Sequence, residues 1–263
     1  MEENKAYQDI VGSSEAPYLT ELARRYGSAS SYDAGYPARC PSLAAYILLT
    51  SGSDHGICDD DPPGSHPLSG SSVFQQIADS GRQWRVYAQS MPANCTLDTT
   101  GTYLVKHNPA TYFTQERARC ATWDVPLGTP TSGNLQRDVD TELPTLSFVV
   151  PDACNDMHGG HGCPEDQLIR RGDDWLHQWL PVVMAGPDYR AGRLTVIITW
   201  DESSSKTDNH IPTLVISPTT TRIQDPTPQT HCTTLRTVED LLRLTPLGCA
   251  AAVAPATARF HLG

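Results

Sequence analysis

The chain has 263 residues, enough for one large folded unit with its own core, and we expect residues 1–263 to form a single domain. The formal charge is −11 and no run of lysine or arginine exceeds two residues, which argues against binding to a nucleic-acid backbone. No stretch is long and apolar enough to span a bilayer, so a membrane-spanning protein is not expected either.

The hydrophobic pattern predicts helices and strands in alternation along the chain. Residues 1–10 are expected to run from a strand end into a loop, followed by helices at 17–26, 42–50 and 73–79 and a long loop at 58–72. The middle of the chain predicts strands at 84–87 and 146–150, with a compact turn at 106–113 and an irregular segment at 121–133 between them. The last third predicts helix 173–184, strands 194–200 and 213–216, and helix 234–242. This alternation without a repeat predicts an α/β fold of the three-layer α/β/α sandwich type.

The eight cysteines fall as four pairs of sequential neighbours, and none has the spacing of a zinc ribbon or a thioredoxin-type motif. Many pairings are open to eight cysteines, and we expect the one in which each pair staples a short local loop. The expected disulfides are Cys40–Cys58, Cys95–Cys120, Cys154–Cys163 and Cys232–Cys249. Disulfides persist in oxidising surroundings, so we favour a secreted protein over a cytosolic enzyme with free buried cysteines. No signal peptide is visible, and we take it to have been removed or left out.

Ser42 opens the second predicted helix, directly after Pro41. The first turn of a helix points free N–H groups outward and carries partial positive charge, so it can seat a phosphate. A hydroxyl group at this position could attack that phosphate. The alternative is that Ser42 is only a helix cap.

Polar residues follow three of the predicted strand segments, where ligands bind in an open α/β sheet. They are Glu3 and Asn4, residues 152–158, and Asp201 and Glu202. Together with Ser42 they predict a site for a hard cation and a phosphate.

Several short motifs follow one another in a fixed order over nearly the whole chain. They are ENKAY (3–7), PSLAAY (41–46) with TSG (50–52), MP (91–92), KHNP (106–109), PD (151–152) with NDMH (155–158), DDWL (173–176) and TWDE (199–202). In this order the chain resembles the bacterial phosphoesterase family of acid phosphatases and phospholipases C, within the alkaline-phosphatase-like superfamily. The resemblance implies an alkaline-phosphatase-like fold and metal-assisted phosphoryl transfer.

The resemblance also implies a role for each motif. Ser42 corresponds to the nucleophile, and its oxygen would also contact the metal ion. The other metal ligands would be Glu3, Asn4, Asp201 and Glu202. The catalytic phosphate-contacting histidines would be His107 and His158, and the substrate-binding neighbours Asn108, Asp156 and Lys5. We expect one divalent ion, and the oxygen-rich ligands favour Ca²⁺, Mg²⁺ or Mn²⁺, with Zn²⁺ left open.

Two positions depart from the family pattern. Relatives usually carry a histidine before the Pro-Ser pair, where this chain has Cys40. They also have a strand leading into the Glu-Asn pair, and here only Met1 and Glu2 precede it.

Other polar residues receive ordinary interpretations. The acidic run at 59–61 is expected to be solvated, with calcium binding as an alternative. Asp173 and Asp174 are placed in the first turn of their helix. His231 is left open between the surface and the site. The histidines expected at the surface are His55, His66, His161, His177 and His210.

The expected function is a secreted, metal-dependent phosphomonoesterase that hydrolyses a small phosphate ester through a phosphoserine on Ser42. The alternative within the family is a phosphodiesterase or phospholipase C. A sulfatase would need a Cys/Ser-x-Pro-x-Arg motif, which residues 40–44 do not provide. From another class, the chain could be a phosphate-ligand binding protein that has lost catalysis, but it keeps Ser42 and the four other expected metal ligands. The oligomeric state is left open.

Overall fold

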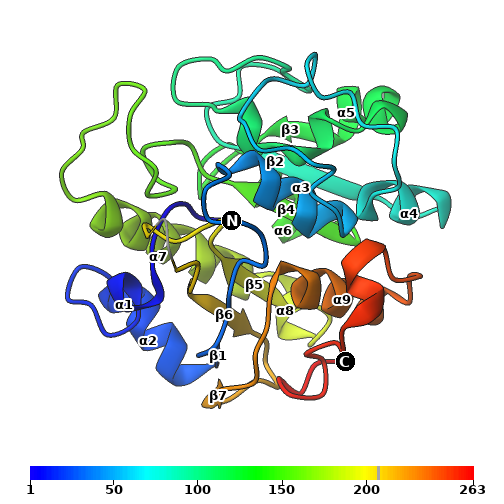
Figure 1. Cartoon of the computed structure of the whole chain (residues 1–263). Coiled ribbons are helices and arrows are strands. Elements are labelled where there is room, and N and C mark those ends of the chain that lie inside the picture. Colours follow the sequence, from blue (N-terminus) through cyan, green and yellow to red (C-terminus); the bar gives the residue numbers. More distant parts are fainter. Residues whose placement is uncertain (206–207) are drawn as a thin grey trace.

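Two β-sheets form the centre of the computed structural model, which describes residues 1–205 and 208–263 (Figure 1). The first sheet has the strand order β5-β6-β1-β7, with β5 Val196–Thr199, β6 Thr213–Ile216, β1 Gly27–Ala29 and β7 Ile223–Asp225. In it β6 is antiparallel to both neighbours. The second sheet is all parallel in the order β3-β2-β4, with β3 Asp124–Pro126, β2 Trp84–Ala88 and β4 Leu146–Val150.

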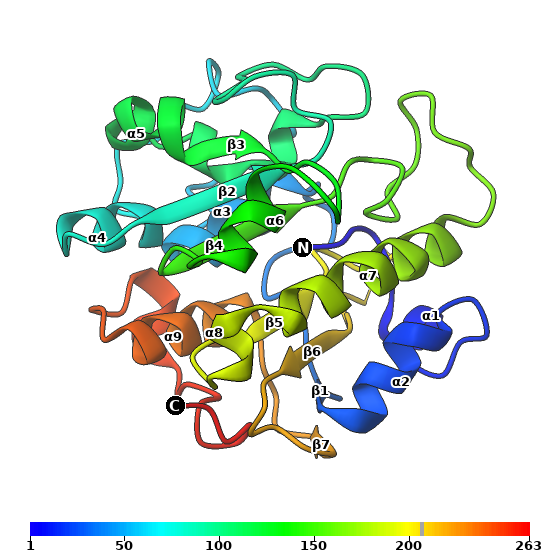
Figure 2. The same cartoon turned by 180° about the vertical axis from the view of Figure 1, so that it is seen from behind.

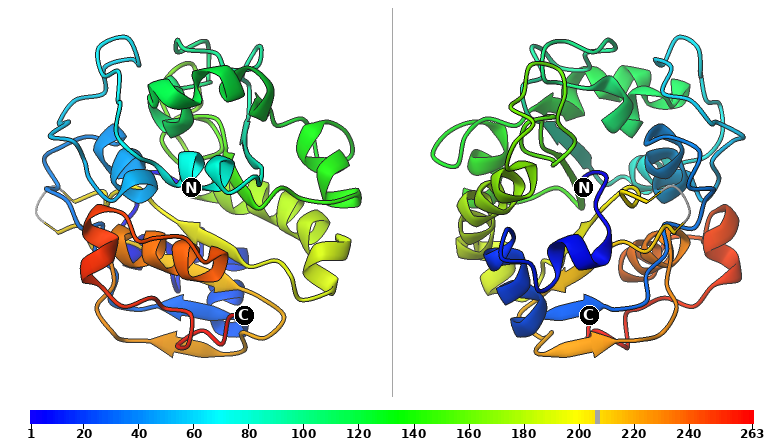
Figure 3. Two further views of the ribbon diagram at one scale, coloured as in Figure 1. Left: turned by 90° about the vertical axis from the view of Figure 1, so that its right-hand side faces the viewer. Right: turned by 60° about the vertical axis from the view of Figure 1, so that its left-hand side comes forward.

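Helices cover both faces of these sheets, with α7 on one side and α3 and α9 on the other (Figures 2 and 3). The α-helices are α1 Tyr7–Ile10, α2 Pro17–Arg25, α3 Leu43–Ser51, α4 Val73–Asp79, α5 Arg117–Trp123, α6 Asn134–Asp140, α7 Leu168–Ala185, α8 Pro187–Arg190 and α9 His231–Leu242. Short 3₁₀ turns occur at Val105–His107, Pro109–Thr111, Thr114–Glu116 and Gly248–Ala252. The three-layer α/β/α sandwich predicted from the sequence is confirmed. Among the described residues, no helix combines the length and apolar character needed to cross a membrane.

Helix α3 lies in the interior, and all nine of its residues are buried. Its sequence, LAAYILLTS, is apolar around nearly the whole circumference, as a helix enclosed on all sides requires. Gly52 ends the helix with a φ of 73°. A Cβ atom on Gly52 would lie 2.4 Å from the Leu247 carbonyl oxygen, so only glycine fits this close approach. Ser42, the residue directly before this helix, is thus held in a fixed position by a buried, closely packed helix.

The edge strands β4 and β5 of the two sheets lie on either side of a slot. The first two residues of the chain bridge this slot. The Met1 amino group donates to the Val149 carbonyl at 3.0 Å. The Glu2 N–H donates to the Thr199 carbonyl at 2.9 Å, and the Asp201 N–H donates to the Glu2 carbonyl at 3.0 Å. Within the described residues, no strand fills the rest of the slot. Glu3 is therefore fixed at the end of a short backbone bridge between the sheets.

The elements with a clear hydrophobic period lie where the sequence predicts them, within a few residues. Three short strands and four short helices were not predicted: β1, β3, β7, α1, α5, α6 and α8. Residues 7–10 form a helical turn rather than a loop, and the segment 121–133, predicted to be irregular, contains the end of α5 and all of β3. Three-residue strands carry too little alternation to be seen in a sequence.

Asp173 was expected in the first turn of its helix, and this prediction is wrong. Helix α7 begins at Leu168, so Asp173 lies in the second turn. Its buried carboxylate accepts the N–H groups of Tyr18 at 3.0 Å and Leu19 at 2.8 Å. These are free amides at the start of α2, where the N-cap residue Ala16 has no side-chain acceptor. Asp173 therefore caps a neighbouring helix instead of its own.

All four disulfides join the sequential neighbours expected from the sequence: Cys40–Cys58, Cys95–Cys120, Cys154–Cys163 and Cys232–Cys249. Two of them lie beside the polar cluster described next. Cys40 precedes Ser42 by two residues, and the Cys154–Cys163 loop carries Asp156 and His158.

Candidate active site

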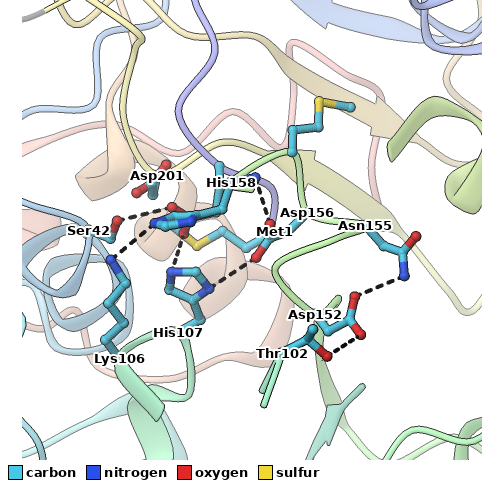
Figure 4. A network of polar contacts seen from close by, with 12 residues as sticks. Met1, Ser42, Thr102, Lys106, His107, Asp152, Asn155, Asp156, His158 and Asp201 are labelled. Atoms are coloured by element: carbon cyan, nitrogen blue, oxygen red, sulfur yellow. Dashed lines mark hydrogen bonds and ion pairs between the residues drawn. The ribbon is translucent and has the colours of Figure 1, made fainter. Parts of the chain in front are cut away.

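Ser42 stands at the N-terminus of α3, and its hydroxyl group donates to Glu3 Oε2 at 3.0 Å. Its side chain makes no capping hydrogen bond to its own helix. The interpretation of Ser42 as a mere helix cap is therefore wrong. The hydroxyl group points instead into a cluster of buried acidic and histidine side chains (Figure 4).

Glu3 is the centre of this cluster and is fully buried. Besides the Ser42 hydroxyl group it accepts the Tyr46 hydroxyl at 2.7 Å and the Asn4 side-chain amide at 3.2 Å. Burial, followed by repulsion from Asp156, raises the pKa of Glu3 to about 8. A nearby positive charge such as a bound cation would favour the ionised form of Glu3, which accepts the hydrogen bond from the Ser42 hydroxyl group.

His107 lies between two carboxylates, with Nε2 3.2 Å from Glu3 Oε1 and Nδ1 3.1 Å from Asp156 Oδ2. Its ring stacks on Tyr46 at 5.2 Å between centroids. The 3₁₀ turn that ends at His107 carries the imidazole to this buried place. Burial raises the pKa of Asp156 well above its ordinary value and lowers that of His107.

His158 and Lys106 form the more open side of the cluster. His158 Nδ1 lies 2.8 Å from the Gly159 carbonyl oxygen, so Nδ1 carries a proton and Nε2 is free to accept. Lys106 Nζ lies 3.3 Å from that Nε2 and 2.6 Å from Asp60 Oδ2. The sequence assigned no role to Lys106 or Asp60, although Lys106 belongs to the KHNP motif.

Asp201 and Glu202 form the remaining acidic part of the cluster. Asp201 Oδ1 accepts the Asn4 N–H at 2.9 Å, while its buried Oδ2 has no hydrogen-bond partner among the described residues. The buried His231 fixes this segment, because its Nε2 lies 2.9 Å from the Asp201 carbonyl oxygen. His231 thus belongs to the framework of the cluster and not to the surface.

The acidic residues fit a divalent cation. Burial raises the pKa of Glu202 to about 8, and burial followed by repulsion from Glu3 raises the pKa of Asp201 well above its ordinary value. A cation would relieve this repulsion and give Asp201 Oδ2 a partner. Asn4 and Glu202 line one pocket together with Cys40 and Pro41, next to Ser42. Among the described residues, the expected acidic ligand that lies in a group of three with ligand atoms within 4.8 Å of one another is Glu3, and its companions there are His107 and His158 rather than Asp201 and Glu202.

A model of the Phosphoesterase family matches residues 11–245. The chain belongs to the phosphoesterase family. Among curated proteins, it is 29% identical over 220 residues to a phosphatidylinositol-3-phosphatase of Mycobacterium tuberculosis, a match that covers 81% of this chain and 65% of the relative.

Solved structures of other proteins share the fold. A protein of the alkaline phosphatase superfamily from Vibrio parahaemolyticus matches with a TM-score of 0.62 at 13% identity, over 98% of this chain and 70% of that one. The lipoteichoic acid synthase LtaP from Listeria monocytogenes matches with a TM-score of 0.52 at 9% identity, over 92% and 71% of the two chains. At these identities the likeness shows the fold alone, and it is the alkaline-phosphatase-like fold expected from the sequence.

Two residues expected to bind substrate are directed elsewhere. The side-chain amide of Asn108 donates to both oxygens of Asp124, at 3.0 and 2.9 Å. Lys5 Nζ donates to the carbonyl oxygens of Asn4 and Met157, at 3.1 and 2.8 Å. Asn108 therefore holds the turn that carries His107, and Lys5 ties the Asn4 backbone to the loop of His158. Both position the site without facing Ser42.

Asp124, the partner of Asn108, predicts a pH dependence of stability. Burial raises its pKa to about 7, above the value of about 4 for an unfolded aspartate. Between these values the unfolded chain has lost a proton that the folded protein still binds, so the free energy of unfolding falls as pH rises, by at most about 1.4 kcal/mol per pH unit. Asp124→Asn should remove this component, measured by urea unfolding at pH 4.5 and 7.5. The exposed Asp98→Asn is the control, and identical pH profiles for Asp124→Asn and wild type would contradict the assignment.

Proposed function

We propose that the chain is a metal-dependent phosphoric ester hydrolase that acts through a phosphoserine intermediate on Ser42. The contact of 3.0 Å between the Ser42 hydroxyl group and the buried Glu3 carries this proposal. It joins a nucleophile at a helix N-terminus to a group that can accept its proton. The family membership and the complete burial of Glu3 beside this hydroxyl group support it.

The proposed metal ligands are Glu3, Asn4, Asp201, Glu202 and the Ser42 oxygen, with one divalent ion whose identity is open. Such an ion supplies positive charge that neutralises phosphate oxygens and favours ionisation of the hydroxyl group. In this chain Asn4 is fixed by its N–H bond to Asp201, and Asp201 by His231. The ligands are thus held in place by the backbone bridge at Met1 and Glu2 and by helix α9.

The chemical steps follow from the contacts of Ser42 and His158. The Ser42 oxygen attacks phosphorus while its proton passes to Glu3 Oε2, and the bond from phosphorus to the leaving oxygen breaks. The negative charge of the bound ester offsets the burial that lowers the pKa of His158, so His158 binds a proton at Nε2 and gives it to the leaving oxygen. Lys106 offsets the negative charge of the phosphoryl group. Neutral His158 then takes a proton from water, which attacks phosphorus. The bond to Ser42 breaks, Glu3 returns the proton to Ser42, and phosphate leaves.

We propose phosphomonoesters as the substrate class and the extracellular space as the location. The mycobacterial relative is named a phosphatidylinositol-3-phosphatase, a name that denotes removal of a phosphomonoester group by that protein, and this supports the proposal. Four disulfides suit an oxidising compartment. Phosphodiester hydrolysis of the phospholipase C type is the alternative for the same site.

An assay with p-nitrophenyl phosphate and its bis-ester tests this function. We expect faster hydrolysis of the monoester, loss of activity after thorough chelation with EDTA, and recovery on adding back Ca²⁺, Mg²⁺, Mn²⁺ or Zn²⁺. Activity that survives complete metal removal would contradict the metal role. Faster turnover of the bis-ester would favour the phosphodiesterase. Phosphate binding without turnover of either ester would favour a binding protein.

A further inference from the structure

The carboxylate of Asp60 lies at the opening of the site, beside the nucleophile. Asp60 Oδ1 accepts the Leu43 N–H at 3.1 Å, and Oδ2 accepts from Lys106 Nζ at 2.6 Å. The Asp60 side chain is 29% exposed and that of Lys106 15%, so the pair is partly shielded from solvent. The expectation that this acidic run is simply solvated is therefore wrong for its middle residue.

These two donors are the ones that a phosphoryl group on Ser42 would use. In the first turn of α3, the N–H groups of residues 44–46 already donate to the carbonyl oxygens of Pro41 and Ser42. The Leu43 N–H makes no such bond within the helix, and it belongs to the residue after the nucleophile. Lys106 is the cation beside His158. The Asp60 carboxylate therefore already occupies the donors that an anion at the start of α3 would use.

The Cys40–Cys58 disulfide holds Asp60 in this position. Cys40 lies two residues before Ser42 and Cys58 two residues before Asp60, with their Cα atoms 4.5 Å apart. On the other side, the Tyr112 hydroxyl group donates to the Asp61 carbonyl oxygen at 3.0 Å. The carboxylate is thus tied to the nucleophile's helix by a covalent link and to the next turn by a hydrogen bond.

On the basis of the proposed function, we propose that Asp60 is an internal competitor for the substrate phosphate. Its carboxylate occupies the Leu43 N–H and the Lys106 ammonium group in the free enzyme, and it leaves both when a phosphate ester binds. The phosphate gains the two donors and escapes the repulsion of an adjacent negative charge. Asp60 therefore sets how tightly the site holds phosphate, including the phosphate product.

Calorimetric titration of the metal-loaded protein with inorganic phosphate tests this competition. We expect Asp60→Asn to bind phosphate about tenfold more tightly than wild type, with a lower KM for p-nitrophenyl phosphate. The matched control is Asp61→Asn, which removes the same charge from an exposed neighbour. Weaker phosphate binding by Asp60→Asn would overturn the proposal, because Asp60 would then serve to orient Lys106. An equal gain in Asp61→Asn would also overturn it.

Lys106→Ala provides the second test. This variant removes one of the two contested donors and leaves the Leu43 N–H contested, so the gain from Asp60→Asn should shrink to about threefold in the double variant. A full tenfold gain in the double variant would show that Asp60 and phosphate do not compete for Lys106. Phosphate binding needs no turnover, so these results decide the role of Asp60 even if the protein fails to hydrolyse p-nitrophenyl phosphate and the proposed function falls. The melting temperature of each variant shows that it is folded.

Discussion

Ser42→Ala should lower kcat for p-nitrophenyl phosphate by about 10³-fold or more while leaving the melting temperature nearly unchanged. The loss is large because the variant lacks the oxygen that forms the bond to phosphorus, and the other groups of the site cannot replace it. Stability is nearly spared because the Ser42 side chain makes no capping bond to α3, and Glu3 Oε2, which loses this donor, still accepts the Asn4 amide. The measurements are steady-state kinetics and thermal unfolding with the same preparation.

Ser72→Ala is the matched control, since Ser72 also precedes a helix. Its side chain does accept the Gln75 N–H at 3.2 Å, so it is a true cap of α4. This variant should lose about 1 kcal/mol of stability and keep its kcat. Ser42→Ala should therefore lose activity and keep its stability, whereas Ser72→Ala should lose stability and keep its activity. If Ser42→Ala retained more than about a tenth of the wild-type kcat, Ser42 could not be the nucleophile.

The sequence predicted the centre of this site because its residues sit in short motifs at strand and helix ends. Asp201 and Ser42 follow or precede elements with clear hydrophobic patterns, and Glu3 stands in the ENKAY motif at the start of the chain. His107 and His158 were placed only through the family resemblance. The structure brings all five together around the Glu3 carboxylate.

The direction of a side chain could not be predicted in the same way. Asn108 adjoins His107 in the KHNP motif, yet its amide turns to Asp124, which comes from a three-residue strand that no pattern reveals. Asp60 was missed because its contact with Leu43 depends on a disulfide across 18 residues. Asp173 was misplaced because nothing in the sequence marks the start of α7 at Leu168. In each case the deciding partner lies far away in the chain.

The slot between β4 and β5 predicts that an engineered strand placed ahead of Met1 will stabilise the protein. The backbone bridge at Glu2 runs parallel to the segment at Trp200, so an extension of five residues would continue between the free edges of the two strands. The cavities on the two faces of the slot are lined by apolar side chains, including Trp179 and Leu180 on one face and Leu235 and Val238 on the other. A run of valine and isoleucine suits a strand buried on both faces.

We expect this extension to add about 2–4 kcal/mol to the free energy of unfolding, or roughly 5–10 °C in melting temperature. A Gly-Ser extension of equal length is the control. Both extensions replace the Met1 ammonium group, whose pKa burial lowers, with a neutral peptide. Only the Val/Ile segment can bury apolar side chains and pair with both edges. Equal melting temperatures for the two extensions would show that the slot does not accept a strand. If the Val/Ile extension stabilises the fold, it should also raise the affinity for the divalent ion, because Glu3 lies two residues after Met1 and would be held by a continuous strand.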